Sequence, residues 1–326
     1  MRIGIHKITT SFEGITSDAP LTIKDEKSLT INLTPESGIN IGLVTVLMGN
    51  DDITSTSYSN GVISISSVTD DVSITAIGII DFADSTVKSL CVSNWGGNVV
   101  EGEITKGEAA AVTSLGGVFR GRTDIKTFDE LRFFTGLTSL YITGNSTGSQ
   151  GEFYNCTNLA SIKLPAVSLT NTSGAFRNTK IGVLDLSPLS QTGNMNGTFH
   201  NNSSLTKVIL PGIAFSGNSW AYTFRTCSNL TTIEIDGTAD FSNVTIFNVP
   251  FYGCSNLETI TGTVTGIKAN ISFASSPKLT RESLLVIING LTQVTTQCTL
   301  TLHATAKARL TADDIAIATA KNWTIA

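Results

Sequence analysis

The chain has 326 residues and a formal net charge of −5, and only 14% of its residues are charged. Its Lys and Arg residues are scattered, whereas a protein that binds duplex nucleic acid concentrates them in a basic stripe, so no nucleic-acid partner is expected. The longest apolar runs, such as residues 42–49, are far shorter than the roughly 20 residues of a membrane-spanning helix, so no membrane insertion is expected either.

Residues 1–78 carry the pattern of several short β-strands. In residues 21–35 and 62–78, apolar and polar side chains alternate, which is typical of strands with one buried face. Turn-forming sequences separate the strands at residues 49–52 (GNDD) and 59–61 (SNG). Strands at this spacing predict a small β-sandwich.

Part of this first segment resembles a known module. Residues 45–76, TVLMGNDDITSTSYSNGVISISSVTDDVSITA, are similar to immunoglobulin-like modules of bacterial surface proteins and phage virion proteins. The resemblance implies that residues 1–78 form an immunoglobulin-like β-sandwich, which acts as a spacer or a docking unit.

Residues 79–132 are predicted to be a helical linker that caps the domain after it. Apolar residues at helical spacing favour one helix within residues 82–95, and an Ala-rich run favours a second within residues 107–119. Arrays of repeated units need such capping segments at their ends, where the first apolar face would otherwise be exposed.

The turn between these helices, residues 97–108, has the length of an EF-hand calcium loop. Its first and third positions, Gly97 and Val99, have no side-chain oxygen to offer a hard cation. We therefore interpret the turn as a degenerate loop, and no metal is expected. An acidic, solvated turn is the alternative reading. If calcium did bind, the remaining ligands would be Glu101, Glu103, Thr105 and Glu108.

One phrase recurs along residues 133–302. It reads FYNCTNLASIKLP from residue 153, FHNNSSLTKVILP from 199 and FRTCSNLTTIEID from 224, with more divergent versions from 176 and 251. The phenylalanines are 23 to 27 residues apart, within the period of leucine-rich repeats. Phe134 and Phe273 extend the series at its two ends.

Fixed offsets from each phenylalanine indicate how the copies pack. A Leu follows by six residues and an Ile or Val by nine, as in Leu159 and Ile162, which predicts a short strand in each copy. Stacked copies would then place phenylalanine over phenylalanine and strand beside strand. Three of the five cysteines follow a phenylalanine by three residues and are expected to fill one small buried slot, as Cys156, Cys227 and Cys254.

The pattern F-x-x-C-x-x-L-x-x-I-x-L-P resembles BspA-like leucine-rich repeat proteins, with similarity over residues 80–326. Residues 123–140 resemble the family's lead-in and residues 276–291 its last repeat. The last segment, residues 303–326, contains a predicted cap of one helix followed by one strand. The resemblance implies a mainly β protein that has an N-terminal β-sandwich, a short helical capping segment and a C-terminal repeat solenoid.

No catalytic constellation is recognisable in the sequence. The three histidines, His6, His200 and His303, are not paired with a nucleophile and a supporting acid, and no clustered zinc ligands occur. The chain is therefore expected not to be an enzyme and to need no cofactor.

Binding is expected on the exposed strand residues of the repeats and on aromatic residues near their turns. The strand candidates are Tyr141, Lys163, Lys207 and Glu234. The aromatic candidates are Tyr154, Trp220, Tyr222 and Tyr252, because aromatic residues often anchor interfaces.

Two biological settings fit these features. The N-terminal residues lack the pattern of a secretory signal, which favours a phage virion structural or adhesion protein of the head-fibre, tail-fibre or decoration type. Such a protein is expected to contact other virion proteins or further copies of itself, and to bind a host surface protein or glycan. The alternative is an adhesin on the bacterial cell surface.

Overall fold

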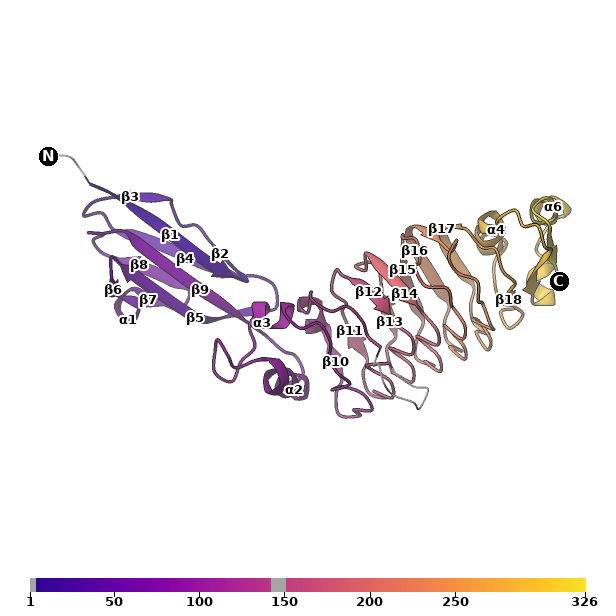
Figure 1. Ribbon diagram of the computed structural model, residues 1–326, viewed down its shortest axis with the longest axis horizontal. Coiled ribbons are helices and arrows are strands. Elements are labelled where there is room, and N and C mark those ends of the chain that lie inside the picture. Colours follow the sequence, from indigo (N-terminus) through magenta and orange to yellow (C-terminus); the bar gives the residue numbers. More distant parts are fainter. Residues whose placement is uncertain (1–3, 142–150) are drawn as a thin grey trace. The chain divides into compact units, whose positions relative to one another are not determined.

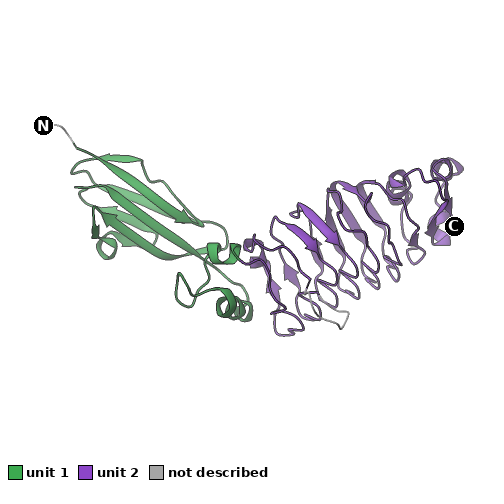
Figure 2. Ribbon diagram, in the orientation of Figure 1, with its two compact units in different colours: residues 1–111 green, residues 112–326 purple. Residues whose placement is uncertain are grey.

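The computed structural model describes residues 4–141 and 151–326 of this mainly β protein (Figure 1). The chain divides into two compact units, residues 1–111 and residues 112–326 (Figure 2). Within the described ranges, no helix is both long and apolar enough to cross a membrane.

Two sheets make up unit 1. The first has the strand order β3 (Thr22–Lys24), β1 (Ile5–Glu13), β9 (Val72–Ile80), β5 (Ile39–Met48) and β6 (Asp51–Asp52). The second has the order β2 (Ile15–Ser17), β4 (Leu29–Pro35), β8 (Val62–Ile65) and β7 (Tyr58–Ser59), and the short helix α1 (Thr54–Ser57) precedes β7. Strands β1 and β9 pair in parallel, and their neighbours pair antiparallel.

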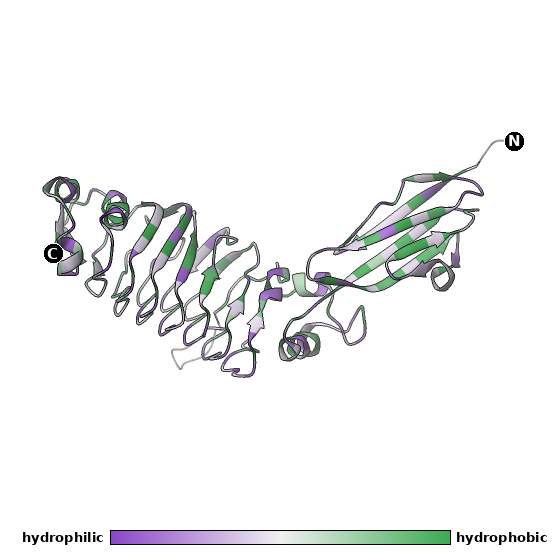
Figure 3. Ribbon diagram, turned by 180° about the vertical axis from the view of Figure 1, so that it is seen from behind, coloured by the Kyte–Doolittle hydropathy of each residue, from purple (hydrophilic) through white to green (hydrophobic). Residues whose placement is uncertain are grey.

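One apolar core serves both sheets of unit 1. Ile31 and Ile63 from the second sheet and Val46 from the first are fully buried in the same cluster. Alternate residues of β4 and β9 are buried, as the alternating sequence pattern predicted (Figure 3).

The predicted helical linker is divided between the two units. Helices α2 (Ser85–Trp95) and α3 (Lys106–Ala110) belong to unit 1, and the residues after Ala111 belong to unit 2. That the two helices cap the repeats stays a prediction. Two contacts hold the α3 region to the first sheet: Ile80 N–H donates to Ile104 O at 3.0 Å, and Gly107 N–H donates to Glu13 Oε1 at 2.5 Å. Helix α3 is also shorter than predicted, because Gly116 and the residue after it have left-handed backbone angles that no helix contains.

Parallel strands run through unit 2. Their order in the sheets is β10 (Thr127–Phe128) with β11 (Ser161–Ile162); β12 (Ser168–Asn171) with β14 (Gln191–Asn194); β13 (Val183–Asp185), β15 (Lys207–Pro211), β16 (Thr232–Asp240) and β17 (Thr259–Thr265); and β18 (Ile271–Phe273), β19 (Cys298–Leu302) and β20 (Trp323–Ile325). In the four-stranded sheet, Leu184 lies opposite Val208, which lies opposite Ile233, which lies opposite Ile260. The predicted repeat strands and their mutual register are thus confirmed.

The repeat phenylalanines stack in one column, as predicted, and we name each copy by its phenylalanine. Centroid distances between successive rings are 4.4 to 5.9 Å from Phe153 to Phe273. The prediction that Phe134 begins the series is wrong: Phe119 lies next to Phe153 at 5.7 Å, whereas Phe134 meets Phe128 edge-on. The 34 residues from Phe119 to Phe153 contain the 3-10 helix Asp129–Phe133 and exceed the 22 to 27 residues between later phenylalanines of the column.

The cysteine slot is also confirmed. The Cys156, Cys227 and Cys254 thiols are buried, and each donates to the phenylalanine carbonyl of the preceding copy, at 2.9, 3.0 and 3.1 Å. In the two copies between them, Thr179 and Asn202 occupy the slot, and Asn202 Nδ2 donates to Thr179 Oγ1 at 2.9 Å. The three cysteines and Asn202 therefore each link their own copy to the one before it, whereas the Thr179 hydroxyl donates to Phe176 O within its own copy.

Three helices follow the last long strand of the repeats: α4 (Arg281–Gly290), α5 (Ala304–Lys307) and α6 (Ala312–Ala320). Helix α6 and strand β20 match the helix and strand expected for the C-terminal cap. Arg281 in α4 makes a bidentate ion pair with Asp314 in α6, with N–O distances of 2.8 and 2.7 Å. This pair fixes the cap to the end of the stack.

Candidate functional groove in the repeats

A groove of about 540 Å³ opens on unit 2, beside strands β12 and β14 and the turns that follow them. Its volume falls within the range of roughly 300 to 1,000 Å³ that is usual for ligand sites. Three consecutive copies line it, with Tyr141 beside them. Its residues are Tyr141, Asn171, Ser173, Gly174, Arg177, Asn194, Asn196, Gly197, His200, Ser219, Tyr222 and Arg225.

The lining follows from the repeat itself. Each of the three copies contributes residues at the same offsets, namely five and two residues before its phenylalanine and one residue after it. Because equivalent residues of stacked copies lie side by side, a position that faces outward in one copy faces outward in the next. The groove is therefore a property of three copies together.

Glycine at one of these offsets leaves the groove open. The residue two before the phenylalanine has a left-handed backbone in successive copies, with φ of 66° at Gly174, 62° at Gly197 and 60° at Tyr222. The two glycines carry no side chain, whereas at the same position of the third copy the Tyr222 side chain lines the groove. A Cβ atom added to Gly174 or Gly197 would meet no heavy atom closer than 3.6 Å, so the space above them is free.

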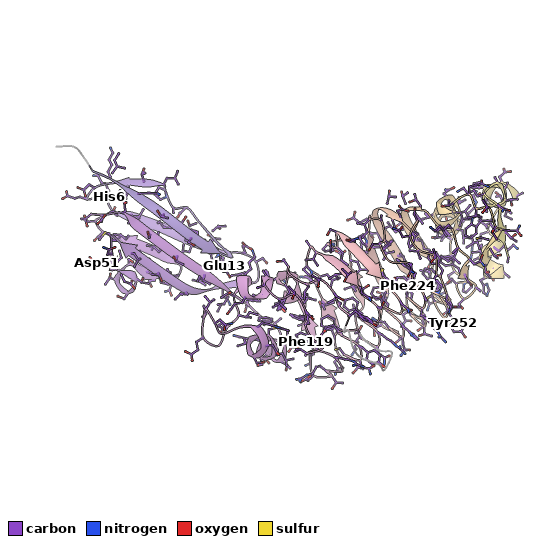
Figure 4. The ribbon with its side chains drawn as sticks, in the orientation of Figure 1. His6, Glu13, Asp51, Phe119, Phe224 and Tyr252 are labelled. Atoms are coloured by element: carbon purple, nitrogen blue, oxygen red, sulfur yellow. The ribbon has the colours of Figure 1, made fainter. Side chains whose placement is uncertain are left out.

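Cationic and aromatic side chains alternate at the position directly after the phenylalanine. In chain order, these residues are Arg120, Tyr154, Arg177, His200, Arg225 and Tyr252. Arg120 and Arg177 lie over the Tyr154 ring at 5.7 and 5.5 Å from its centroid. The Arg225 guanidinium lies 5.5 Å from the ring centroids of both Tyr222 and Tyr252. Tyr252 belongs to the copy after that of Phe224, and both residues are labelled in Figure 4.

The charge of the groove is positive at neutral pH. None of the described lining residues is acidic, and Arg177 and Arg225 supply two permanent charges. His200 lies between these two copies, and its pKa is lowered to about 4 by burial and by the nearby charges of the two arginines. The imidazole is therefore neutral at pH 7, able to donate one hydrogen bond and accept another.

The polar groups of the groove are partly preorganised. Asn194 Oδ1 accepts hydrogen bonds from Asn218 N–H and Ser219 N–H at 3.0 and 3.2 Å, and Asn171 Oδ1 accepts one from a backbone N–H at 2.8 Å. These carboxamides hold their orientation through their oxygens and offer their NH₂ groups as donors. By contrast, the Arg225 Nε–H is buried and has no hydrogen-bond partner within the described part of the chain.

The five aromatic residues among the predicted binding residues fall into three groups. Tyr141 and Tyr222 line the groove. Tyr154 and Tyr252 are held by the cation–π contacts beside it, and Tyr252 remains 55% exposed. Trp220 is only 2% exposed and packs against Phe215 and Phe241 at 4.9 and 4.8 Å, so the prediction that it lies on the surface is wrong. Its indole fills space inside unit 2.

The other three strand candidates, Lys163, Lys207 and Glu234, lie away from the groove. Lys207 on β15 and Glu234 on β16 form an ion pair at 2.6 Å, diagonally across the two strands. Lys163 pairs with Asp129 at 3.2 Å. Sequence reasoning missed the arginines of the groove, although the recurrence of a charged or aromatic residue directly after the phenylalanine was visible in the repeated phrase.

The side chains of the degenerate loop are engaged within unit 1. Glu103 forms an ion pair with Lys88 at 2.7 Å. Thr105 and Glu108 make the capping box of α3, and Thr105 is 1% exposed. The oxygens of Glu103, Thr105 and Glu108 thus serve the ion pair and the N-terminal end of helix α3. The remaining carboxylate, Glu101, is exposed on the turn.

One other group of potential metal ligands exists in the described residues: His6, Asp70 and Asp71, whose ligand atoms lie within 4.8 Å of one another. His6 Nε2 already lies 3.0 Å from Asp25, and Asp71 Oδ1 accepts a backbone N–H at 2.7 Å. The two aspartates are exposed at the surface, and acidic groups gather there in many proteins without a metal.

Comparison with known families identifies the repeats. The chain matches the family described as "BspA type Leucine rich repeat region", in six copies, over residues 134–241 and 195–298. Together these segments cover half of the chain. The chain belongs to the BspA-type leucine-rich repeat family. The whole lining of the groove lies within the matched BspA-type copies. No curated protein and no solved structure matches the chain.

Proposed function

We propose that this BspA-type protein is a non-enzymatic binding protein that recognises a partner through its repeat unit. The observation that carries the proposal is that three consecutive copies direct equivalent positions into one groove. Membership of a family of repeat-based surface or protein-interaction proteins supports it. In this proposal the repeats form a solenoid, and unit 1 is an immunoglobulin-like sandwich that docks the repeats to a larger assembly.

The same architecture serves two settings equally well. In a phage virion, unit 1 would attach to the particle and the repeats would contact a host protein or glycan. On a bacterial cell, unit 1 would be the spacer of a surface adhesin. Intact-protein mass spectrometry on purified particles and on cell envelopes of the source would separate the two settings, because a fixed copy number in particles supports the first and recovery in envelopes supports the second.

Binding by the full chain tests the function itself. Fluorescently labelled chain should bind to cell surfaces saturably, and the double variant Arg177→Gln, Arg225→Gln should lose most of that binding. The matched control is Lys163→Gln, which removes a cation whose side chain is 62% exposed and lies outside the groove. Equal binding by all three proteins would refute a role for the groove, and binding lost equally in the control would point to charge alone.

A further inference from the structure

The groove has the character of an anion site. Arg225 presents a buried Nε–H that no described residue satisfies, and leaving such a donor without an acceptor is costly. A guanidinium matches the two oxygens of a carboxylate in a planar, bidentate arrangement, which gives both strength and geometric selectivity. The described lining combines the two guanidinium groups of Arg177 and Arg225 with no acidic residue, so an anionic ligand would find charged partners there without a competing carboxylate.

The spacing of the copies sets the length of that ligand. The rings of copies 176 and 199 are 5.9 Å apart, and those of copies 199 and 224 are 5.1 Å apart. Equivalent positions of Arg177 and Arg225 are therefore separated by roughly 10 Å, about two strand spacings. Between them lies the neutral His200, which offers a hydrogen bond without a third positive charge. A ligand that spans the groove thus meets cation, neutral donor and cation in turn.

The remaining lining favours a sugar over a peptide. A peptide segment in a groove is usually held by apolar side chains in apolar pockets, or by pairing with a strand edge. The groove contains no Ala, Val, Leu, Ile or Met among its described lining residues. Its lining consists instead of carboxamides, hydroxyl groups, two glycines and the rings of Tyr141 and Tyr222, which suit the hydroxyl groups and the flat faces of saccharide rings.

We propose that the groove binds a carboxylate-bearing oligosaccharide, with Arg177 and Arg225 holding its acidic groups and the asparagines of copies 176 and 199 holding its hydroxyl groups. This inference rests on the proposed binding function and names the class of ligand. The two glycines admit the sugar rings, and Tyr222 closes the groove where the third copy begins.

Isothermal titration calorimetry with defined probes tests the proposal on the full chain. The probes are an oligogalacturonate, the corresponding neutral galactose oligomer, a sulfated oligosaccharide of the same length and a Glu-rich peptide. We expect the oligogalacturonate to bind at least tenfold more tightly than the other three, a difference of about 1.4 kcal/mol. Its affinity should fall as salt is raised, since the charges are partly exposed to solvent.

Two variants locate the site. Arg177→Gln with Arg225→Gln should weaken oligogalacturonate binding at least tenfold, and Gly197→Tyr should abolish it by filling the floor of the groove. Tyr222 has nearly the same left-handed φ as Gly197, 60° against 62°, which shows that this backbone accepts a tyrosine. Lys163→Gln is the control, and unchanged thermal unfolding of each variant shows that it is folded.

Each alternative result has a distinct meaning. Equal or tighter binding of the neutral oligomer, the sulfated oligosaccharide or the peptide would overturn the assignment of a carboxylated sugar. Failure of all four probes, while cell binding still depends on the two arginines, would overturn the saccharide and leave the proposed function standing. Failure of both the probes and the cell binding would overturn both proposals.

Discussion

Replacing Phe199 by alanine should destabilise the repeats strongly. Phe199 is fully buried and stacks on Phe176 at 5.9 Å and on Phe224 at 5.1 Å, with interplanar angles of 14° and 7°. Removal of a buried phenylalanine side chain typically costs about 3 to 5 kcal/mol. The two ring pairs, each worth about 0.5 to 1.5 kcal/mol beyond the buried area, are included in that measured cost. Because both interfaces of one copy are lost, we expect a cost of about 4 kcal/mol.

Thermal unfolding of the full chain measures this loss. For a folded unit of about 150 to 250 residues, 1 kcal/mol lowers the midpoint by about 2 to 4 °C, so Phe199→Ala should lower the unfolding midpoint of unit 2 by roughly 8 to 16 °C. Trp220, buried in unit 2 and 6.2 Å from the Phe224 ring, reports on this transition by its fluorescence. The transition of unit 1 should not move, because Phe199 and the two rings that it stacks on all belong to unit 2.

The control is Tyr252→Ala, which removes a ring of similar size that is 55% exposed and lies outside the phenylalanine column. Because its specific contact is the cation–π contact with Arg225, its removal should cost no more than about 1 kcal/mol. Two results would refute the view that stacked phenylalanines hold the copies together. One is a loss of folding stability below about 1.5 kcal/mol for Phe199→Ala. The other is a loss for Tyr252→Ala that equals the loss for Phe199→Ala.

Three further predictions concern ionisable groups. Ellman's reagent should react first with Cys298, which is partly exposed, and slowly with the buried thiols, since burial raises the pKa of Cys156 to about 12; rapid reaction of several thiols would contradict this. The Arg281 hydrogen bonds lower the pKa of Asp314 to about 2. The stability that they contribute is therefore present above pH 4 and is lost as the pH falls towards 2. Urea unfolding should show that Asp314→Asn is less stable than the wild type above pH 4 and equally stable near pH 2. Burial and nearby positive charge lower the pKa of His200 to about 4. After allowance for solvent screening, the folding stability should fall by on the order of 1 kcal/mol as the pH drops from 6.5 to 4. The variant His200→Gln should not show that fall.

The repeat register was predictable because one side chain per copy defines it. The aliphatic residue nine positions after the phenylalanine, such as Val208 or Ile233, points into the core and pairs with its equivalent in the next strand. The copy that contains Phe119 was not predicted from the sequence, because its phrase has diverged from those of the later copies. Ile125 stands where later copies have Leu, and Phe128 stands where they have Ile or Val, yet both are fully buried.

The groove was harder to predict, since it depends on which turn residues share a space. Arg177 and Arg225 are 48 positions apart in sequence and meet one groove only because their copies are stacked. The burial of Trp220 was not predictable for the opposite reason. This residue follows a turn-like sequence, SGNS, that suggests exposure, but its ring lies inside unit 2 against Phe215. Local polarity identifies turns, and only the packing decides which side chains they direct inward.

The shared register of the repeat strands means that the protein can change length in whole copies. Each repeat strand pairs with the strand before it and the strand after it in the same register. The deletion or duplication of one period would therefore bring equivalent strands together and leave both ends of the unit unaltered. Recombination between copies is therefore a structurally mild event over most of unit 2. The exception is the run from Gly174 to Tyr222, where the order of small and large residues matters, and a change in copy number there would lengthen, shorten or close the groove in a single step.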